Sequence, residues 1–189
     1  MTGAQQEKRT GIVYDKNLPR WLNYTKSFVE TNDLDPVYVG VNSAMRSGVL
    51  SKEQAHNFLL VMSTFYSIGE ACRVVALDIE GKDIWDYLID NYATLKRGRG
   101  RRHFRGQQGT TCLSYLKANY GSPSDFVEHH HKPTYEAICK SFVKVPNFGP
   151  YHVWKWLDFF ERILEMPVQV DLHHALSVLP SEPLSLIHI

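Results

Sequence analysis

Positive charge is concentrated in one short stretch of this sequence. Residues 96–105 hold six basic side chains and no acid: Lys96, Arg97, Arg99, Arg101, Arg102 and Arg105. The whole chain has 21 Lys and Arg against 20 Asp and Glu, a net charge of +1, so the chain without this basic segment carries about −5. A cationic stretch on a mildly acidic body is typical of phosphate binding. A solvated surface loop is the alternative interpretation.

A second candidate anion site lies at Pro146-Asn147-Phe148-Gly149. The pattern predicts that one helix ends near Val145, that the chain turns, and that another helix begins with Pro150 in its first turn, where proline is favoured. Such a turn presents backbone N–H groups and the positive end of a helix dipole, and both attract anions.

Two histidine clusters raise the question of a metal site. Glu128 precedes three consecutive histidines at 129–131, and Asp171 lies close to His173 and His174. Zinc needs three or four converging ligands, whereas adjacent histidines on a short helix point in different directions. We therefore expect surface clusters and neither a metal nor another cofactor. Gln107 and Gln108 could contact base edges, but a polar loop explains them equally well.

Composition excludes several classes of protein. The chain has 189 residues, 43% of them hydrophobic, which predicts one packed domain. No apolar run approaches the roughly 20 residues of a membrane-spanning helix, and the polar N-terminus does not resemble a secretory signal. Three cysteines without a CxxC pair indicate reduced thiols, and we expect a cytoplasmic protein with no membrane partner.

Apolar residues recur at three- and four-residue steps along most of the chain, which predicts an all-α fold. The first expected helix begins at Pro19 and is broken at residues 33–36, and others cover residues 51–77, 84–95, 111–120, 134–143 and 150–164. Residues 122–124 open a short helix that contains Phe126 and Val127, while residues 37–45 fit either a helix or a strand. Residues 1–17 are a polar lead-in, 18–179 the helical domain and 180–189 a tail. Trp154 and Trp156 cannot share a helix face, so we expect one in the core and one partly exposed.

The segment Val145–Gly149 resembles the helix-hairpin-helix of the DNA glycosylase superfamily, which usually reads apolar residue, Pro, Gly, apolar residue, Gly. Asn147 replaces the first glycine, and asparagine tolerates left-handed backbone angles. That superfamily has an Asp about twenty residues after the hairpin, and Asp171 follows Gly149 by 22 residues. Tyr151 occupies the position of the Schiff-base lysine of bifunctional glycosylases, so the resemblance does not support lyase chemistry.

Four further stretches are similar to the α-glutamyl/putrescinyl thymine pyrophosphorylase family, clade 2, also called amino acid:DNA transferases. They are Phe65–Ala71, Phe148–Pro150, Trp154–Asp158 and Glu161–Val168. The resemblance implies a bacteriophage enzyme acting in the host cytoplasm, where a separate 5-hydroxymethyluracil DNA kinase supplies 5-(pyrophosphomethyl)uracil in DNA. An amino acid or polyamine then displaces pyrophosphate. The chain has no GxxxxGK[ST] motif, so it is not itself that kinase.

The resemblance also suggests roles for particular residues. Asp171 is the expected base, or positions the amine, and His173 is the second candidate. Departing pyrophosphate would be stabilised by Arg97, Arg99, Arg101, Arg102 and Arg105. DNA would be bound by Asn147, Phe148, Gly149, Tyr151 and Lys155.

Two other functions remain open: a DNA N-glycosylase using the same turn and Asp171, and a non-catalytic DNA-binding module. One further expectation concerns the end of the chain. Residues 184–189 look like translated sequencing-adapter read-through, so the native protein is expected to continue differently after about Leu179.

Overall fold

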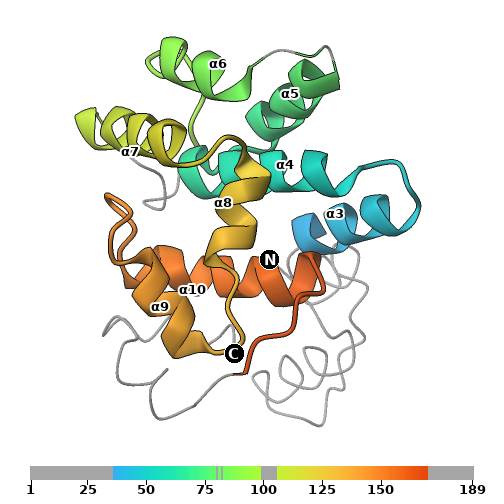
Figure 1. The fold of residues 1–189 in the computed structure, drawn as a ribbon. Coiled ribbons are helices and arrows are strands. Elements are labelled where there is room, and N and C mark those ends of the chain that lie inside the picture. The colour runs from blue at the N-terminus through green and yellow to red at the C-terminus, as the bar shows by residue number, and fades with distance from the viewer. Residues whose placement is uncertain (1–35, 80, 82, 99–105, 170–189) are drawn as a thin grey trace, which may run out of the picture. The chain divides into compact units, whose positions relative to one another are not determined.

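The computed structural model describes residues 36–79, 81, 83–98 and 106–169 (Figure 1). The predicted helix from Pro19, the lead-in at 1–17 and the tail at 180–189 lie outside these residues. Backbone contacts divide the chain into two compact units, residues 1–40 and 41–189. Apart from the first residues of α3, every element below belongs to the second unit.

All regular elements within the described ranges are helical, which confirms the predicted all-α class. They are α3 (Pro36–Arg46), α4 (Lys52–Phe65), α5 (Ile68–Ile79), α6 (Ile84–Asp90), α7 (Gln107–Asn119), α8 (Pro123–His130), α9 (Tyr135–Phe142), α10 (Pro150–Asp158) and the π-helical turn η1 (Phe159–Ile163). None of these helices is both long and apolar enough to cross a membrane.

Helix α4 begins as the sequence predicts and ends earlier. Ser51 and Gln54 form a capping box, in which each side chain accepts a hydrogen bond from the backbone N–H of the other residue. The prediction of one helix over residues 51–77 is wrong, because Tyr66 adopts left-handed angles with φ 51° and ends α4. After this corner α5 packs back along α4 (Figure 1). Residues 55–65 of α4 are all buried, as in a helix covered on every side.

The helix predicted over residues 84–95 is also shorter than expected. Helix α6 ends at Asp90, and residues 91–94 form turns. The Asn91 side chain donates to the Tyr87 carbonyl at 2.9 Å, a local bond that competes with continuation of the helix. Tyr92 and Leu95 are nevertheless buried, so their apolar spacing reflects burial in a turn.

Helices α8 and α9 begin within one residue of their predicted starts, and α7 does not. Helix α7 begins four residues before the predicted start at 111, α8 begins after Ser122, and α9 begins after Thr134. The Ser122 and Thr134 side chains each accept a bond from a backbone N–H three residues later. The ambiguous segment at 37–45 lies in α3.

Aromatic rings fill the interface of α8, α9 and α10. Trp156 is fully buried, with ring centroids 5.2 Å from Phe126 and 5.3 Å from Phe159. The prediction that one tryptophan is partly exposed is wrong, since Trp154 is also buried, edge-on to Tyr135 at 5.8 Å. Residues two apart on a helix face different directions, so α10 is covered on more than one side.

The chain after η1 returns to the start of α9. Gln169 donates its N–H to the Pro133 carbonyl at 2.8 Å and accepts from the Tyr135 N–H at 3.0 Å. These bonds form the isolated bridge between Thr134 and Gln169. Helix α9 has eight residues and is therefore about 12 Å long, so this bridge and the α9–α10 connection lie at opposite ends of it.

Candidate nucleic-acid interface

The connection between α9 and α10, residues 143–149, has the local geometry expected of an anion-binding turn. Asn147 takes left-handed angles with φ 66°, as its tolerance of that region predicts. Pro150 is the first residue of α10, and its N-cap Gly149 supplies no side-chain cap. Gly149 has an ordinary φ of −78°, and a Cβ built there would meet nothing within 4 Å. A ligand can therefore approach the backbone closely at this position.

Phe148 fixes this turn to the core. It is only 8% exposed and stacks on Phe142 with ring centroids 5.2 Å apart and planes 8° from parallel. The buried ring therefore holds the backbone of the turn in place, and little of it is accessible for the predicted contact with DNA. Tyr151 and Lys155, the other predicted DNA-binding side chains, are partly exposed on α10.

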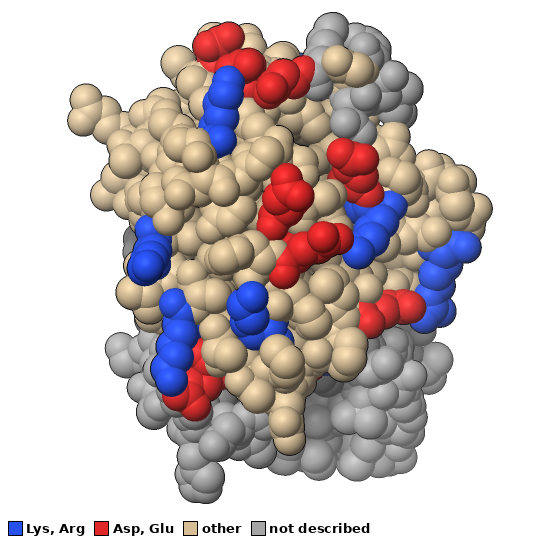
Figure 2. Space-filling view, in the orientation of Figure 1, with Lys and Arg blue, Asp and Glu red and all other residues tan. Residues whose placement is uncertain are grey.

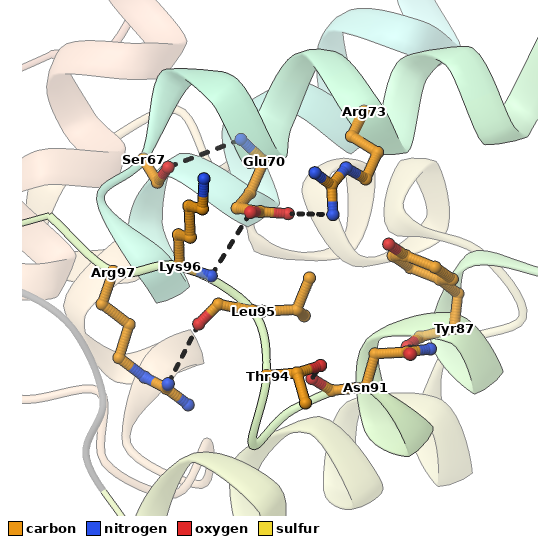
Figure 3. A network of polar contacts seen from close by, with 9 residues as sticks. All are labelled: Ser67, Glu70, Arg73, Tyr87, Asn91, Thr94, Leu95, Lys96 and Arg97. Atoms are coloured by element: carbon orange, nitrogen blue, oxygen red, sulfur yellow. Dashed lines mark hydrogen bonds and ion pairs between the residues drawn. The ribbon is translucent and has the colours of Figure 1, made fainter.

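The first residues of the basic segment dock on the corner between α4 and α5 (Figure 3). The Lys96 N–H donates to Glu70 Oε1 at 3.3 Å, and the Gly98 N–H donates to the Phe65 carbonyl at 3.0 Å. Glu70 is buried and its other carboxylate oxygen lies 3.4 Å from the Arg73 guanidinium. A Cβ on Gly98 would lie 2.2 Å from the Tyr66 carbonyl oxygen, so only glycine fits this approach.

Arg97 braces the same segment. Its guanidinium donates to the Tyr92 carbonyl at 2.7 Å and to the Leu95 carbonyl at 3.1 Å. It also lies 4.4 Å from the Tyr92 ring centroid, within cation–π range. Two of its five N–H donors are thus used within the chain, and the side chain is half-buried.

The start of α7, which follows the basic segment in the sequence, lies beside the α9–α10 turn. Helix α7 begins directly after Gly106, and the carbonyl of its second residue, Gln108, accepts a hydrogen bond from Asn147 Nδ2 at 2.7 Å. The α9–α10 turn is therefore bonded to the helix that directly follows the basic segment in the sequence. Gln107 and Gln108 are exposed. Arg99, Arg101, Arg102 and Arg105 lie outside the described residues.

Comparison with known proteins matches residues 43–177 to the family described as amino acid:DNA transferase. The chain belongs to the amino acid:DNA transferase family. It is 41% identical over 170 residues to a putrescinyltransferase of Delftia phage PhiW-14, covering 90% of this chain and 53% of that protein. It is 29% identical over 169 residues to a glycinyltransferase of Pseudomonas phage PaMx11, covering 79% of this chain and 56% of that protein.

A third relative is more distant. It is a sugar fermentation stimulation protein homolog of Trichodesmium erythraeum (strain IMS101), 23% identical over 176 residues, covering 77% of this chain and 70% of that protein. The chain spans about half the length of the two phage relatives. The matched region of the transferase family includes α4–α10, and so includes both the α9–α10 turn and the basic segment.

The predicted catalytic residues of this transferase-family chain, Asp171 and His173, lie outside the described residues. The described backbone reaches Gln169, which is held at the start of α9 by its bonds to Pro133 and Tyr135. Their roles remain predictions.

The three consecutive histidines have different surroundings. His130 is buried between Tyr120 and Ser141, His131 Nε2 lies 3.3 Å from the Pro167 carbonyl, and His129 is exposed. Among the described residues of the transferase-family chain, no group of three His, Cys, Asp or Glu side chains could hold a metal ion.

The structure also shows a pocket that the sequence did not predict. It has a volume of about 470 Å³ and lies between the end of α7, α8 and the end of α9. Its lining residues are Tyr115, Asn119, Tyr120, Gly121, Asp125, His129, Ser141 and Lys144. Lys144 belongs to the α9–α10 turn, so the pocket adjoins the candidate interface. Single polar residues on three helices form no motif, and this explains why no sequence pattern indicates the pocket.

Proposed function

We propose that this chain takes part in transferring an amino acid or polyamine onto a pyrophosphate-activated pyrimidine in DNA, in the cytoplasm of a phage-infected bacterium. The observation that carries the proposal is the Asn147–Gln108 hydrogen bond, which joins the α9–α10 turn to the start of α7, the helix that follows the basic segment in the sequence. Membership of the amino acid:DNA transferase family agrees with it.

The α9–α10 turn would hold a DNA backbone phosphate. Backbone N–H groups at the start of α10 and the helix dipole favour an anion there. Gly149 allows its close approach, and Lys155 on α10 adds a positive charge. The target base would have to leave the stack for its carbon to be reached.

The basic segment would bind the pyrophosphate. In the proposed substrate, 5-(pyrophosphomethyl)uracil made by an upstream kinase, the amine nitrogen forms a bond to the methylene carbon. The carbon–oxygen bond breaks, and pyrophosphate leaves with the electron pair. Arg99, Arg101, Arg102 and Arg105 would stabilise the charge that develops on it, while Arg97 holds the start of the segment in place.

The attacking nitrogen must be an uncharged amine, so its ammonium form has to lose a proton. Asp171 is the proposed acceptor of that proton or the group that positions the amine, and His173 is the second candidate. The Asp171→Asn variant keeps the size of the side chain and removes its charge. It should abolish transfer while DNA affinity stays unchanged.

The test is mass spectrometry of nucleosides from pyrophosphorylated DNA incubated with the chain and a pool of amines. A heavier nucleoside in intact strands, absent with Asp171→Asn, is the expected result. Strands that break in alkali at abasic sites would instead indicate a glycosylase. DNA binding without any altered nucleoside would indicate a non-catalytic module.

A further inference from the structure

The pocket beside the α9–α10 turn has a hydrogen-bond network whose direction can be assigned. Ser141 Oγ donates to the Ile138 carbonyl at 2.7 Å, since that carbonyl can only accept. His130 Nδ1, 2.9 Å from Ser141 Oγ, must then be the donor in that contact. His130 Nε2 is left as an acceptor and receives the Tyr120 hydroxyl proton at 2.8 Å.

Burial keeps this arrangement fixed. His130 is 1% exposed and stacks on Phe142 with ring centroids 4.2 Å apart. Loss of hydration lowers the His130 pKa to about 3, so the imidazole is neutral near neutral pH. Burial also raises the pKa of the Tyr120 hydroxyl, which therefore keeps its proton. The hydrogen-bond direction does not reverse over the physiological range.

The network leaves the pocket rich in acceptors. Tyr120 and Ser141 direct their protons into the protein, so their oxygens have lone pairs left for a ligand in the pocket. Asp125 adds a carboxylate that has no ion-pair partner among the described residues. The rings of Tyr115 and Tyr120 favour a cation by cation–π attraction. These features together match a group with several N–H donors and a positive charge.

We propose that this pocket binds the primary ammonium group of the amine substrate, with Asp125 as its counter-ion. The inference rests on the proposed function and names the site of its second substrate. Lys144, also without an ion-pair partner in the described part of the chain, lines the same pocket and offers a contact for a carboxylate. An amino acid can use both charged side chains, and its single nitrogen must lose its proton after binding and before attack. A diamine can use only Asp125, and it can attack with its other nitrogen.

The pocket is connected to the proposed DNA site through packed rings. Tyr120 lies edge-on to Phe126 at 5.3 Å, and Phe126 lies 5.8 Å from Phe148 in the α9–α10 turn. The wall of the pocket and the turn that would hold DNA are therefore parts of one aromatic cluster. An amine bound here would lie near the end of α9 that leads into the α9–α10 turn.

Calorimetric titration of the chain with glycine and, separately, with putrescine tests the proposal without DNA. Asp125→Asn should weaken binding of whichever amine binds by about 10- to 100-fold, the size expected for a charge-assisted contact. Lys144→Met should weaken the binding of glycine and leave the binding of putrescine unchanged, because only glycine has a carboxylate. This result distinguishes an amino acid from a polyamine as the source of the ammonium group. Tyr120→Phe removes one acceptor and should have a smaller effect than Asp125→Asn.

Asp86→Asn is the matched control. Asp86 and Asp125 both occupy the third position of a helix and donate their N–H to the capping side chain, but Asp86 lies on α6 outside the pocket. It should leave amine binding unchanged. Because Asp86 also pairs with Lys117, the control loses at least as much local stability as the test variant.

The failures of the two proposals can be told apart. If neither amine binds the wild-type chain, or if Asp125→Asn binds as tightly as wild type, the pocket proposal is wrong. Transfer with an unchanged KM for the amine in Asp125→Asn would also overturn the pocket while leaving the proposed function intact. Asp125-dependent amine binding without any transfer to DNA would leave the pocket and overturn the function.

Discussion

Asn147 shows how one side chain joins two segments that lie 39 residues apart. Its left-handed φ of 66° could be predicted, because asparagine replaces a glycine in the resemblance and tolerates that conformation. Its hydrogen bond to the Gln108 carbonyl could not, because a side chain of this type bonds any carbonyl that packing brings near. The contact that best supports the proposed function was therefore absent from the sequence pattern.

The burial of His130 likewise could not be predicted from the sequence. Three consecutive histidines suggest a surface cluster, and only the α8–α9 packing shows that the middle one is buried between two hydroxyls. The exposure of neighbouring residues on a short helix differs because each faces a different direction. Residue type alone could not assign this histidine to the core.

The buried histidines predict a loss of stability in acid. Burial lowers the pKa of His130 from 6.5 to about 3, and that of His56 from 6.5 to about 4. At pH values between the unfolded pKa and the folded pKa of each histidine, the unfolded chain binds a proton that the folded chain does not. The free energy of unfolding should therefore fall as the pH decreases from about 6.5 towards 3. Above about pH 7 these two groups add no pH dependence.

Urea denaturation of wild type and His130→Gln over this pH range is the measurement. The variant should be less stable at neutral pH, because glutamine cannot stack on Phe142, but its stability should decline less steeply in acid. The slope that remains belongs to His56 and to other titrating groups. Equal slopes for the two proteins would show that His130 does not cause the acid sensitivity.

At the scale of elements, the sequence predicts where helices begin better than where they end. Ser51, Ser122 and Thr134 cap α4, α8 and α9 through local partners, and these helices begin within one residue of the predicted starts. The end of α4 at Tyr66 depends on a non-glycine residue in the left-handed region, which no local rule favours. The predicted partial exposure of one tryptophan is wrong for a related reason, since Trp154 is buried by a contact with Tyr135 on another helix.

The corner between α4 and α5 predicts the effect of a small substitution. Gly98→Ala would place a Cβ 2.2 Å from the Tyr66 carbonyl oxygen, so the backbone must move. We expect a loss of about 1–3 kcal/mol in the free energy of unfolding. DNA binding should weaken as well, because the start of the basic segment is displaced from Phe65 and Glu70.

Gly69→Ala is the control for this substitution. Gly69 lies in α5, and a Cβ there would meet nothing within 4 Å. Alanine is the better helix former, so this variant should be unchanged or more stable by up to about 1 kcal/mol. Equal stabilities of the two variants in chemical denaturation, with equal DNA affinities in fluorescence anisotropy, would show that the docking of Gly98 is unimportant.

At the scale of the whole molecule, charge distribution limits how DNA can be bound. The net charge is only +1, and the described part of the face in Figure 2 shows acidic and basic side chains interspersed. Several lysines are already neutralised, as in the pairs Lys117–Asp86 and Lys140–Glu136. Attraction to DNA must therefore come from a local concentration of charge, and residues 96–105 are the place where the sequence provides it.

The salt dependence of DNA affinity should therefore be set by particular arginines of the basic segment. Each phosphate contact contributes about −0.9 to the slope of log K against log salt concentration on duplex DNA. Replacing Arg101 and Arg102 by glutamine should therefore reduce the magnitude of the slope by up to about 2, as measured by anisotropy with a labelled duplex at several salt concentrations. Lys117→Gln and Lys140→Gln should leave it unchanged, because both lysines are paired with acids. If the arginine and lysine variants lower the slope equally, DNA senses the overall charge of the chain, and the basic segment has no special role in binding it.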